Sequence, residues 1–317
     1  FRVMLTRRHI RVKVLQTLYA RHQSEDQDQV SQEKFLTRSL EQMQELQALL
    51  LLMIAAVRDQ AEKFAQRSQQ KYFASDDERN PSVNFINNQL VDLIKNHETL
   101  TQFAKNKKLK NWQQDDEYVI ILFNKLKDAS WYQNYLAIKE PSFEEDRDFV
   151  VRFYKEILAQ DEKLYDYIED KSLTWIDDFP WVNTALVKLL NKVVPSRANE
   201  IFTLGVFKDQ DDQQFGQNLF RSVLRNHEEL QQVLLGKTPN WDQERIADLD
   251  LIMLHMGICE FLHFPSIPVR VTINEYLEIA KEYSTPKSSL FINGILDNIV
   301  KDLMAKDELN KNERGLR

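Results

Sequence analysis

Three residues in the last third of the chain have types and a spacing that could bind zinc: His255, Cys259 and His263. They recur every fourth residue, and on a helix this spacing places them along one face. A helix rises roughly 1.5 Å per residue, so the two histidines would lie about 12 Å apart. One ion cannot span them, because metal–nitrogen bonds are about 2 Å long. We therefore expect a buried cysteine, two histidines at helix interfaces, and no metal or other cofactor.

Three acidic clusters could suggest general acid–base catalysis. They lie in polar linkers or at expected helix starts, where acids interact favourably with the helix dipole. The sequence also contains no Gly-rich phosphate loop, nucleophile elbow or zinc-protease motif. We therefore interpret the acids as helix caps and predict that the chain is not an enzyme. The clusters are Glu144-Glu145-Asp146, Asp177-Asp178 and Asp211-Asp212.

Basic residues are concentrated at the start of the chain, and no acid precedes Glu25. Apolar residues recur there at helical spacing from Ile10 to Tyr19, which predicts an amphipathic helix over residues 8–22. Because the chain carries a formal net charge of −7, contact with nucleic acid would require a local basic patch of this kind. We expect the cations of this helix to stay in water: Arg7, Arg8, Arg11 and Lys13.

The elements that position these residues are predicted to be helices. Six Gly and eight Pro in 317 residues are too few for the many turns of a sheet protein, so the expected fold class is all-α. The helix predicted over 242–263 is apolar nearly all round and should be central. Apolar periodicity predicts the other helices over 32–72, within 82–109, 115–140 and 142–170, and over 272–283 and 287–304.

Local signals refine the C-terminal helices. Thr272 and Glu275 form a capping-box pattern, which predicts that a helix starts at Thr272. Gly294 falls in the middle of the last helix, where glycine is unfavourable relative to alanine, so we expect it to permit close helix packing. Residues 305–317 are charged, and we expect them to fray as a flexible tail.

The sequence predicts neither secretion nor membrane contact. The longest apolar run, residues 48–57, is shorter than the about 20 residues that cross a bilayer, so we expect a buried helix. Cys259 is the only cysteine, and the N-terminus lacks the apolar core of a secretory signal. We therefore predict a cytoplasmic protein. The oligomeric state stays open.

A comparison of the chain with itself aligns residues 153–186 with residues 219–252. Both stretches have the pattern of an amphipathic helix, a polar turn with Trp, and an apolar helix. This pattern suggests a degenerate repeat. Two unrelated helical hairpins with similar loops would align in the same way.

Three C-terminal segments stand in an order and spacing that resemble the NusB family: LDLIMLHMGICEFL (249–262), IPVRVTINEYLEIAK (267–281) and FINGILD (291–297). The segment RRHIRVKVLQTLY (7–19) is similar to that family's Arg-rich first helix, which ends in a Leu-Tyr pair. Leu219-Phe220-Arg221 and the residues after them resemble that family's helix before the central one. The resemblance covers about residues 4–23 and 215–304.

The resemblance implies an all-helical fold of two small bundles and a role in transcription antitermination without catalysis. The implied partners are a boxA-type single-stranded RNA, the ribosomal protein NusE and the transcription elongation complex. Family members are usually less than half this length, so an additional helical region is inserted in the N-terminal half. The chain then divides into a basic RNA-binding helix (1–24), a helical elaboration to which the suggested degenerate repeat is assigned (25–214), a NusB-like helical core (215–304) and the flexible tail (305–317).

Carried over by position, the resemblance also implies functional residues. Arginines bind phosphates, and an exposed aromatic ring can stack on an unpaired base. By their spacing, Tyr19 and Phe291 fit a packed position in the core as well as an exposed position for stacking on a base. Lys287 stands where the family often has an acid, and Glu244 and Asp250 are expected to face the protein partner. The expected RNA-binding residues are Arg7, Arg8, Arg11, Lys13, Tyr19, Lys287, Ser288, Ser289 and Phe291.

Two other functions fit parts of the pattern. The chain could be a protein-interaction scaffold without direct RNA binding, in which the long middle helices dock partners and the basic helix only packs. NusB-like domains also precede rRNA cytosine methyltransferases. This sequence ends soon after the matched segments and leaves no room for a cofactor-binding sheet, so we rank the methyltransferase last.

Overall fold

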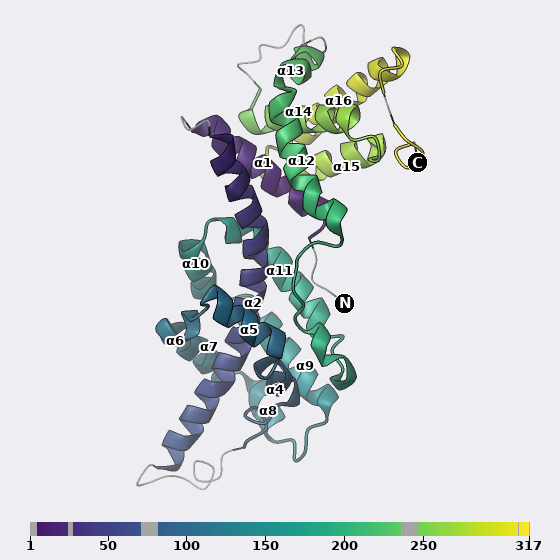
Figure 1. The fold of residues 1–317 in the computed structure, drawn as a ribbon. Coiled ribbons are helices and arrows are strands. Elements are labelled where there is room, and N and C mark those ends of the chain that lie inside the picture. Colours follow the sequence, from purple (N-terminus) through teal and green to yellow (C-terminus); the bar gives the residue numbers. More distant parts are fainter. Residues whose placement is uncertain are drawn as a thin grey trace. The chain divides into compact units, whose positions relative to one another are not determined.

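The computed structural model describes residues 5–24, 28–70, 82–235, 237, 246–309 and 311–316, and the regular elements in these ranges are all helices (Figure 1). The predicted all-α class is confirmed. The chain forms two compact units, one within residues 41–206 and one from residues 5–40 and 207–317. The long helix α2 (Gln29–Gln69) contributes its first turns to the second unit and the rest to the first.

The second unit is built around helix α14 (Asp248–His263), which is buried nearly all round. The predicted central position of this helix is confirmed. Its first residue is Asp248, so the start predicted at Asp242 is wrong, because Ile246 and Ala247 are described and are not helical. The helices that contact α14 are α1 (Arg7–Gln23), α12 (Gln210–Arg225), α13 (His227–Leu235), α15 (Val269–Tyr283) and α16 (Ser288–Ala305).

Helix α15 does not begin at Thr272, as the capping-box pattern predicted. It begins at Val269, and Thr272 lies in its first turn. The hydroxyl of Thr272 donates to Glu260 in α14 (2.9 Å), while Glu275 accepts hydrogen bonds from Arg8 in α1. The prediction was wrong because polar groups inside the bundle need hydrogen-bond partners, and these two side chains supply them.

Close helix packing occurs at glycines other than the predicted one. A Cβ atom on Gly216 in α12 would lie 2.8 Å from Cγ2 of Ile10 in α1, and one on Gly257 in α14 would lie 3.0 Å from Cδ2 of Leu296. Gly294 is exposed, and no described atom lies within 4 Å of the position of its Cβ. The prediction for Gly294 is therefore wrong, because this residue lies on the outer face of α16.

The C-terminal residues fold back on the end of α14, which corrects the expectation of a flexible tail. The ammonium of Lys311 donates to the backbone carbonyls of Glu260 and Phe264, both at 2.9 Å. The backbone N–H of Asn312 donates to the carbonyl of Pro265 (3.2 Å). These bonds satisfy carbonyl groups at a helix C-terminus, which otherwise lack partners in the helix.

The first unit packs around the remainder of α2. Two indole N–H groups donate to backbone carbonyls of this helix, from Trp112 to Leu49 and from Trp175 to Gln42, both at 2.8 Å. The other elements of the unit are α4 (Gln89–Lys95), α5 (Glu98–Lys107), α6 (Asn111–Gln114), α7 (Asp116–Asp128), α8 (Ser130–Leu136), α9 (Phe143–Phe153), the π-helix η1 (Tyr154–Leu158), α10 (Glu162–Lys171), α11 (Thr174–Leu190) and the 3-10 helix η2 (Pro195–Glu200).

Helix α2 is long and apolar enough to cross a membrane by length and composition alone. However, 72% of its most apolar window is buried inside the fold, as in a core helix. Leu49, Leu50 and Ile54 are fully shielded from solvent. The prediction that residues 48–57 form a buried helix is confirmed.

The two stretches that align as a degenerate repeat contain helices in the same order. The first stretch runs from the end of α9 and the π-helix η1 through α10 into α11, and the second from α12 through α13 into α14. Trp241, which aligns with Trp175, lies outside the described residues. Two unrelated helical hairpins would show the same order, so duplication stays a hypothesis.

Candidate nucleic-acid interface

Helix α1 carries most of the predicted RNA-binding residues, and a capping box fixes its start. The hydroxyl of Thr6 accepts a hydrogen bond from the backbone N–H of His9, and Nδ1 of His9 accepts one from the backbone N–H of Thr6. Burial lowers the pKa of His9 to about 4, so its ring is neutral near pH 7 and can accept this bond. The helix predicted over residues 8–22 is confirmed as Arg7–Gln23.

Arg11 lies in a buried polar junction between α1, α14 and α15, and the expectation that it stays in water is wrong. Its side chain is 1% exposed. Nε and Nη2 donate to the two carboxylate oxygens of Glu260, at 2.7 and 2.9 Å. Thr272 Oγ1 and Tyr276 Oη donate to the same carboxylate, at 2.9 and 2.8 Å. We call these four residues the buried junction, in which each charge has the partners that a buried pair requires.

The electrostatics of the buried junction keep its groups in one protonation state. Burial opposes the charge on Arg11, but the charge and hydrogen bonds of Glu260 outweigh burial and raise the pKa of Arg11. Burial, reinforced by Glu260, raises the pKa of Tyr276 far above its usual value, so the phenol remains a donor. The Phe215 ring centroid lies 5.1 Å from Cζ of Arg11, at cation–π distance. Arg11 therefore joins three helices and is shielded from solvent.

Arg7 and Arg8 are also paired with carboxylates, but they remain partly exposed. Nε and Nη2 of Arg8 donate to Glu275 at 3.1 and 2.9 Å, and this hydrogen bonding raises the pKa of Arg8. Nε of Arg7 donates to Asp212 at 2.6 Å. The side chains of Arg7 and Arg8 are 30% and 40% exposed. Because a guanidinium has five N–H groups, both can still donate to a phosphate, beside a carboxylate that weakens the local positive potential.

Lys13 and Tyr19 lie on different sides of α1. Lys13 is 2% exposed, so the expectation that it stays in water is wrong, whereas Tyr19 is 37% exposed. Helix α1 contacts α12, α14 and α15, and therefore buries more of its circumference than an amphipathic surface helix does. Of the two residues, only Tyr19 presents its side chain to solvent.

The predicted RNA-binding loop forms the N-cap and first turn of α16. Lys287 occupies the N-cap position and is exposed, while Ser289 and Phe291 are partly buried. Leu290 is 76% exposed between them. Leu290 was not among the residues expected at this surface, because an apolar residue type gives no signal for an exposed position.

Ser288 and Asp250 stabilise the turn that precedes α16. The hydroxyl of Ser284 donates to the carboxylate of Asp250 at 2.6 Å, and its oxygen lies 2.9 Å from the hydroxyl oxygen of Ser288. Ser288 is 4% exposed and Asp250 is 5% exposed. Asp250 therefore does not face a partner on the surface of this structure. The other predicted partner residue, Glu244, lies outside the described residues.

The three residues of metal-binding type do not form a metal site. Cys259 is buried, as expected, and burial raises the pKa of its thiol to about 12. His255 is also buried, whereas His263 is exposed and its Nε2 lies 3.0 Å from a carboxylate oxygen of Glu229. In the part of the chain that the structure describes, no group of three or more His, Cys, Asp or Glu could hold a metal ion.

The acidic clusters lie near helix starts, but the expectation that they cap these helices is only partly confirmed, because the N-cap residues of α9 and α12 are Ser142 and Asp209 and α11 has no side-chain cap. Ser142 and Glu145 form a capping box at the start of α9. Asp177 lies in the first turn of α11, and Asp211 and Asp212 lie in the first turn of α12. Asp212 has the additional role of binding Arg7.

Comparisons with known proteins identify the family. A model of the NusB family matches residues 184–301. The transcription antitermination protein NusB of Salinibacter ruber is 40% identical over 109 residues, which are 34% of this chain and 68% of that protein. The chain belongs to the NusB family. The NusB of Finegoldia magna is 39% identical over 93 residues (29% of this chain, 68% of that protein), and that of Chloroherpeton thalassium is 39% identical over 98 residues (31% and 46%).

The family match does not reach every residue of the candidate interface. It begins within α11 and ends within α16, so it includes Lys287 and Phe291 and leaves out α1. The structure nevertheless places α1 in the same compact unit as α12 to α16. Contacts between α1 and α14 complete the helical core of this NusB-family chain.

Proposed function

We propose that this chain is a transcription antitermination factor that binds boxA-type single-stranded RNA together with the ribosomal protein NusE on the transcription elongation complex. The observation that carries the proposal is membership of the NusB family, whose curated relatives are named transcription antitermination proteins. Transcription takes place in the cytoplasm of bacteria, and we propose that this protein acts there, without catalysis.

The structure narrows which of the expected residues can contact RNA directly. Arg7, Arg8, Tyr19 and Lys287 are at least partly exposed, and they offer cationic donors and an aromatic face. Arg11, Lys13 and Ser288 are buried. We propose that Arg11, Lys13 and Ser288 position the RNA-binding residues, and that Ser289 and Phe291 contribute at the start of α16.

Fluorescence anisotropy with an end-labelled boxA-type RNA tests the proposal. Binding should strengthen when NusE is added. Each of Arg8→Ala and Lys287→Ala should weaken RNA binding and reduce the slope of affinity against salt by about 0.7, since each removes one phosphate contact to a single strand. Lys301→Ala is the matched control, because Lys301 is 72% exposed on α16 and pairs with Asp297.

Two results would overturn parts of this proposal. If the unaltered protein binds no RNA in the presence or absence of NusE, the chain is not an RNA-binding factor. Retention of NusE or other proteins without RNA would then favour the protein-interaction scaffold. If the RNA binds and Arg8→Ala behaves like Lys301→Ala, the RNA does not contact the N-terminal end of α1.

A further inference from the structure

A cleft of about 980 Å³ lies in the second unit, beside the C-terminal end of α12. Its walls come from α1, α2, α12, α13 and α14, and no acid is among the described residues that line it. Its volume is at the upper end of the range of about 300–1,000 Å³ that is usual for small-ligand sites. The residues that bring positive charge or imidazole groups to the cleft are Arg21, His22, Arg221, Arg225, His227 and His255.

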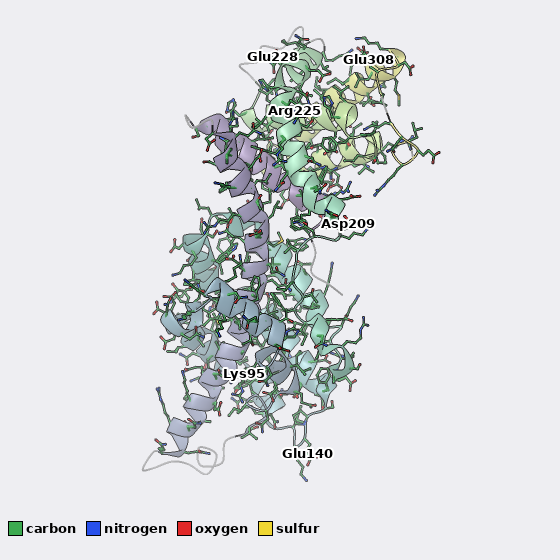
Figure 2. All side chains as sticks on the ribbon, in the orientation of Figure 1. Lys95, Glu140, Asp209, Arg225, Glu228 and Glu308 are labelled. Atoms are coloured by element: carbon green, nitrogen blue, oxygen red, sulfur yellow. The ribbon has the colours of Figure 1, made fainter. Side chains whose placement is uncertain are left out.

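Arg225 is an exposed cation of this cleft with no charged partner in the described structure. Arg221 donates to both carboxylate oxygens of Glu33, at 2.9 and 2.6 Å, and Arg21 donates to the neutral Gln32. Arg225 is exposed at the C-terminal end of α12, opposite the N-cap residue Asp209 (Figure 2). A guanidinium in this state can bind a phosphate without first breaking an ion pair.

His255 provides a hydrogen-bonding group in the wall of the cleft. It is 4% exposed, and its Nε2 has no hydrogen-bond partner in the described structure. Burial and the neighbouring His227 lower the pKa of His255 to about 4, so the imidazole is neutral near pH 7. The two rings pack edge to face, with centroids 5.2 Å apart. A neutral imidazole suits the edge of a base better than a phosphate, and an unpaired buried nitrogen gains from such a partner.

Apolar side chains complete the wall beside His255. Leu18, Val223 and Ile252 line the cleft, and each is less than a tenth exposed. The cleft thus combines a free guanidinium, a neutral hydrogen-bonding group and an apolar surface. A nucleotide matches all three, because its phosphate suits the guanidinium, the edge of its base suits the imidazole and the face of its base suits the apolar surface.

We propose that this cleft binds one nucleotide of a single-stranded RNA, with its phosphate at Arg225 and its base against the apolar wall beside His255. The inference rests on the proposed RNA-binding function and adds a site for a base that none of the residues carried over from the family supplies. A second cleft, of about 570 Å³, is lined by Arg225, Arg221 and Arg7. Because Arg7 lies at the start of α1 and Arg225 lines both clefts, an RNA strand bound at the start of α1 could continue through this second cleft to Arg225.

The test compares two end-labelled strands of equal length, a boxA-type RNA and an abasic strand that keeps the phosphates. Arg225→Ala should weaken binding of both strands roughly tenfold, because a charge-assisted contact to phosphate is lost. His255→Phe keeps an aromatic ring and removes the nitrogens, so it should weaken the RNA roughly fivefold and leave the abasic strand unchanged. Lys301→Ala is again the control for loss of one exposed positive charge.

The outcomes separate this inference from the proposed function. If the unaltered protein binds neither strand, both fail. If it binds RNA and Arg225→Ala behaves like Lys301→Ala, only the cleft is excluded, and this exposed substitution does not threaten folding. Equal weakening of both strands by His255→Phe would overturn the placement of the base. Displacement of the RNA by an oligoaspartate of equal charge, as effective as by unlabelled RNA, would assign the cleft to an acidic protein segment.

Discussion

The buried junction and the cleft beside α12 use similar residue types in opposite ways. In the buried junction, the guanidinium of Arg11 and the carboxylate of Glu260 satisfy each other, and Thr272 and Tyr276 supply further hydrogen bonds. In the cleft, Arg225 has no charged partner among the described residues, and Nε2 of His255 has no hydrogen-bond partner there. The difference shows that the number of cations on a helix does not measure the charge that the helix offers to a ligand.

The largest expected loss of stability comes from a substitution that breaks the buried junction. Glu260→Gln removes the negative charge and leaves the buried guanidinium of Arg11 uncompensated, which should lower the free energy of unfolding of the second unit by about 3–5 kcal/mol. Urea denaturation followed by far-ultraviolet circular dichroism measures the change. The double variant Arg11→Met with Glu260→Leu should recover much of the loss, because the unpaired charge is then absent. Stability of Glu260→Gln equal to that of the unaltered protein would contradict a structural role for the pair.

The stability of the second unit should depend on pH through His255, which lies in the wall of the cleft. Because the pKa of His255 in the folded state is about 4, below its usual value of 6.5, the fold prefers the neutral imidazole. Its contribution to stability is therefore complete above about pH 6.5 and is lost as the pH falls toward 4. The expected loss between pH 7 and pH 5 is about 2 kcal/mol.

His255→Phe provides the comparison for this pH dependence. The variant should lose that part of the slope of stability against pH. His9, whose pKa is also about 4, should contribute a similar slope that the variant retains. An unchanged slope in His255→Phe would show that the ring is already charged or solvated in the folded protein.

The smallest expected changes in the free energy of unfolding come from two glycine substitutions, one on an exposed helix face and one beside the buried junction. Gly294→Ala should raise the free energy of unfolding by about 1 kcal/mol, because Gly294 is exposed in mid-helix and nothing in the described structure lies near the new methyl group. Gly216→Ala should lower it by about 1 kcal/mol or more, because the methyl group would overlap Ile10, next to Arg11 on α1. Thermal denaturation of both variants measures the difference, and equal shifts of the two in one direction would contradict the packing described.

Much of the fold could be predicted because helical periodicity is a local property. The spacing of apolar residues predicted α1, α2 and α16 closely, since one helix face is set by residues three and four positions apart. The start of α15 was predicted wrongly, because Thr272 and Glu275 bind groups on other helices instead of capping their own. The pattern of a capping box cannot show which other partners a side chain will meet.

The sequence by itself determined the all-α class, the central apolar helix and the resemblance to NusB, because these depend on order and spacing along the chain. Tertiary structure decided which cations remain available. Arg11 and Glu260 are 249 residues apart in sequence and meet in the core, so the most basic helix buries two of its four predicted surface cations. Arg225, which no sequence signal distinguished, is left at the surface beside His255. The physical reason is that the burial and pairing of a charge depend on elements that are distant in sequence.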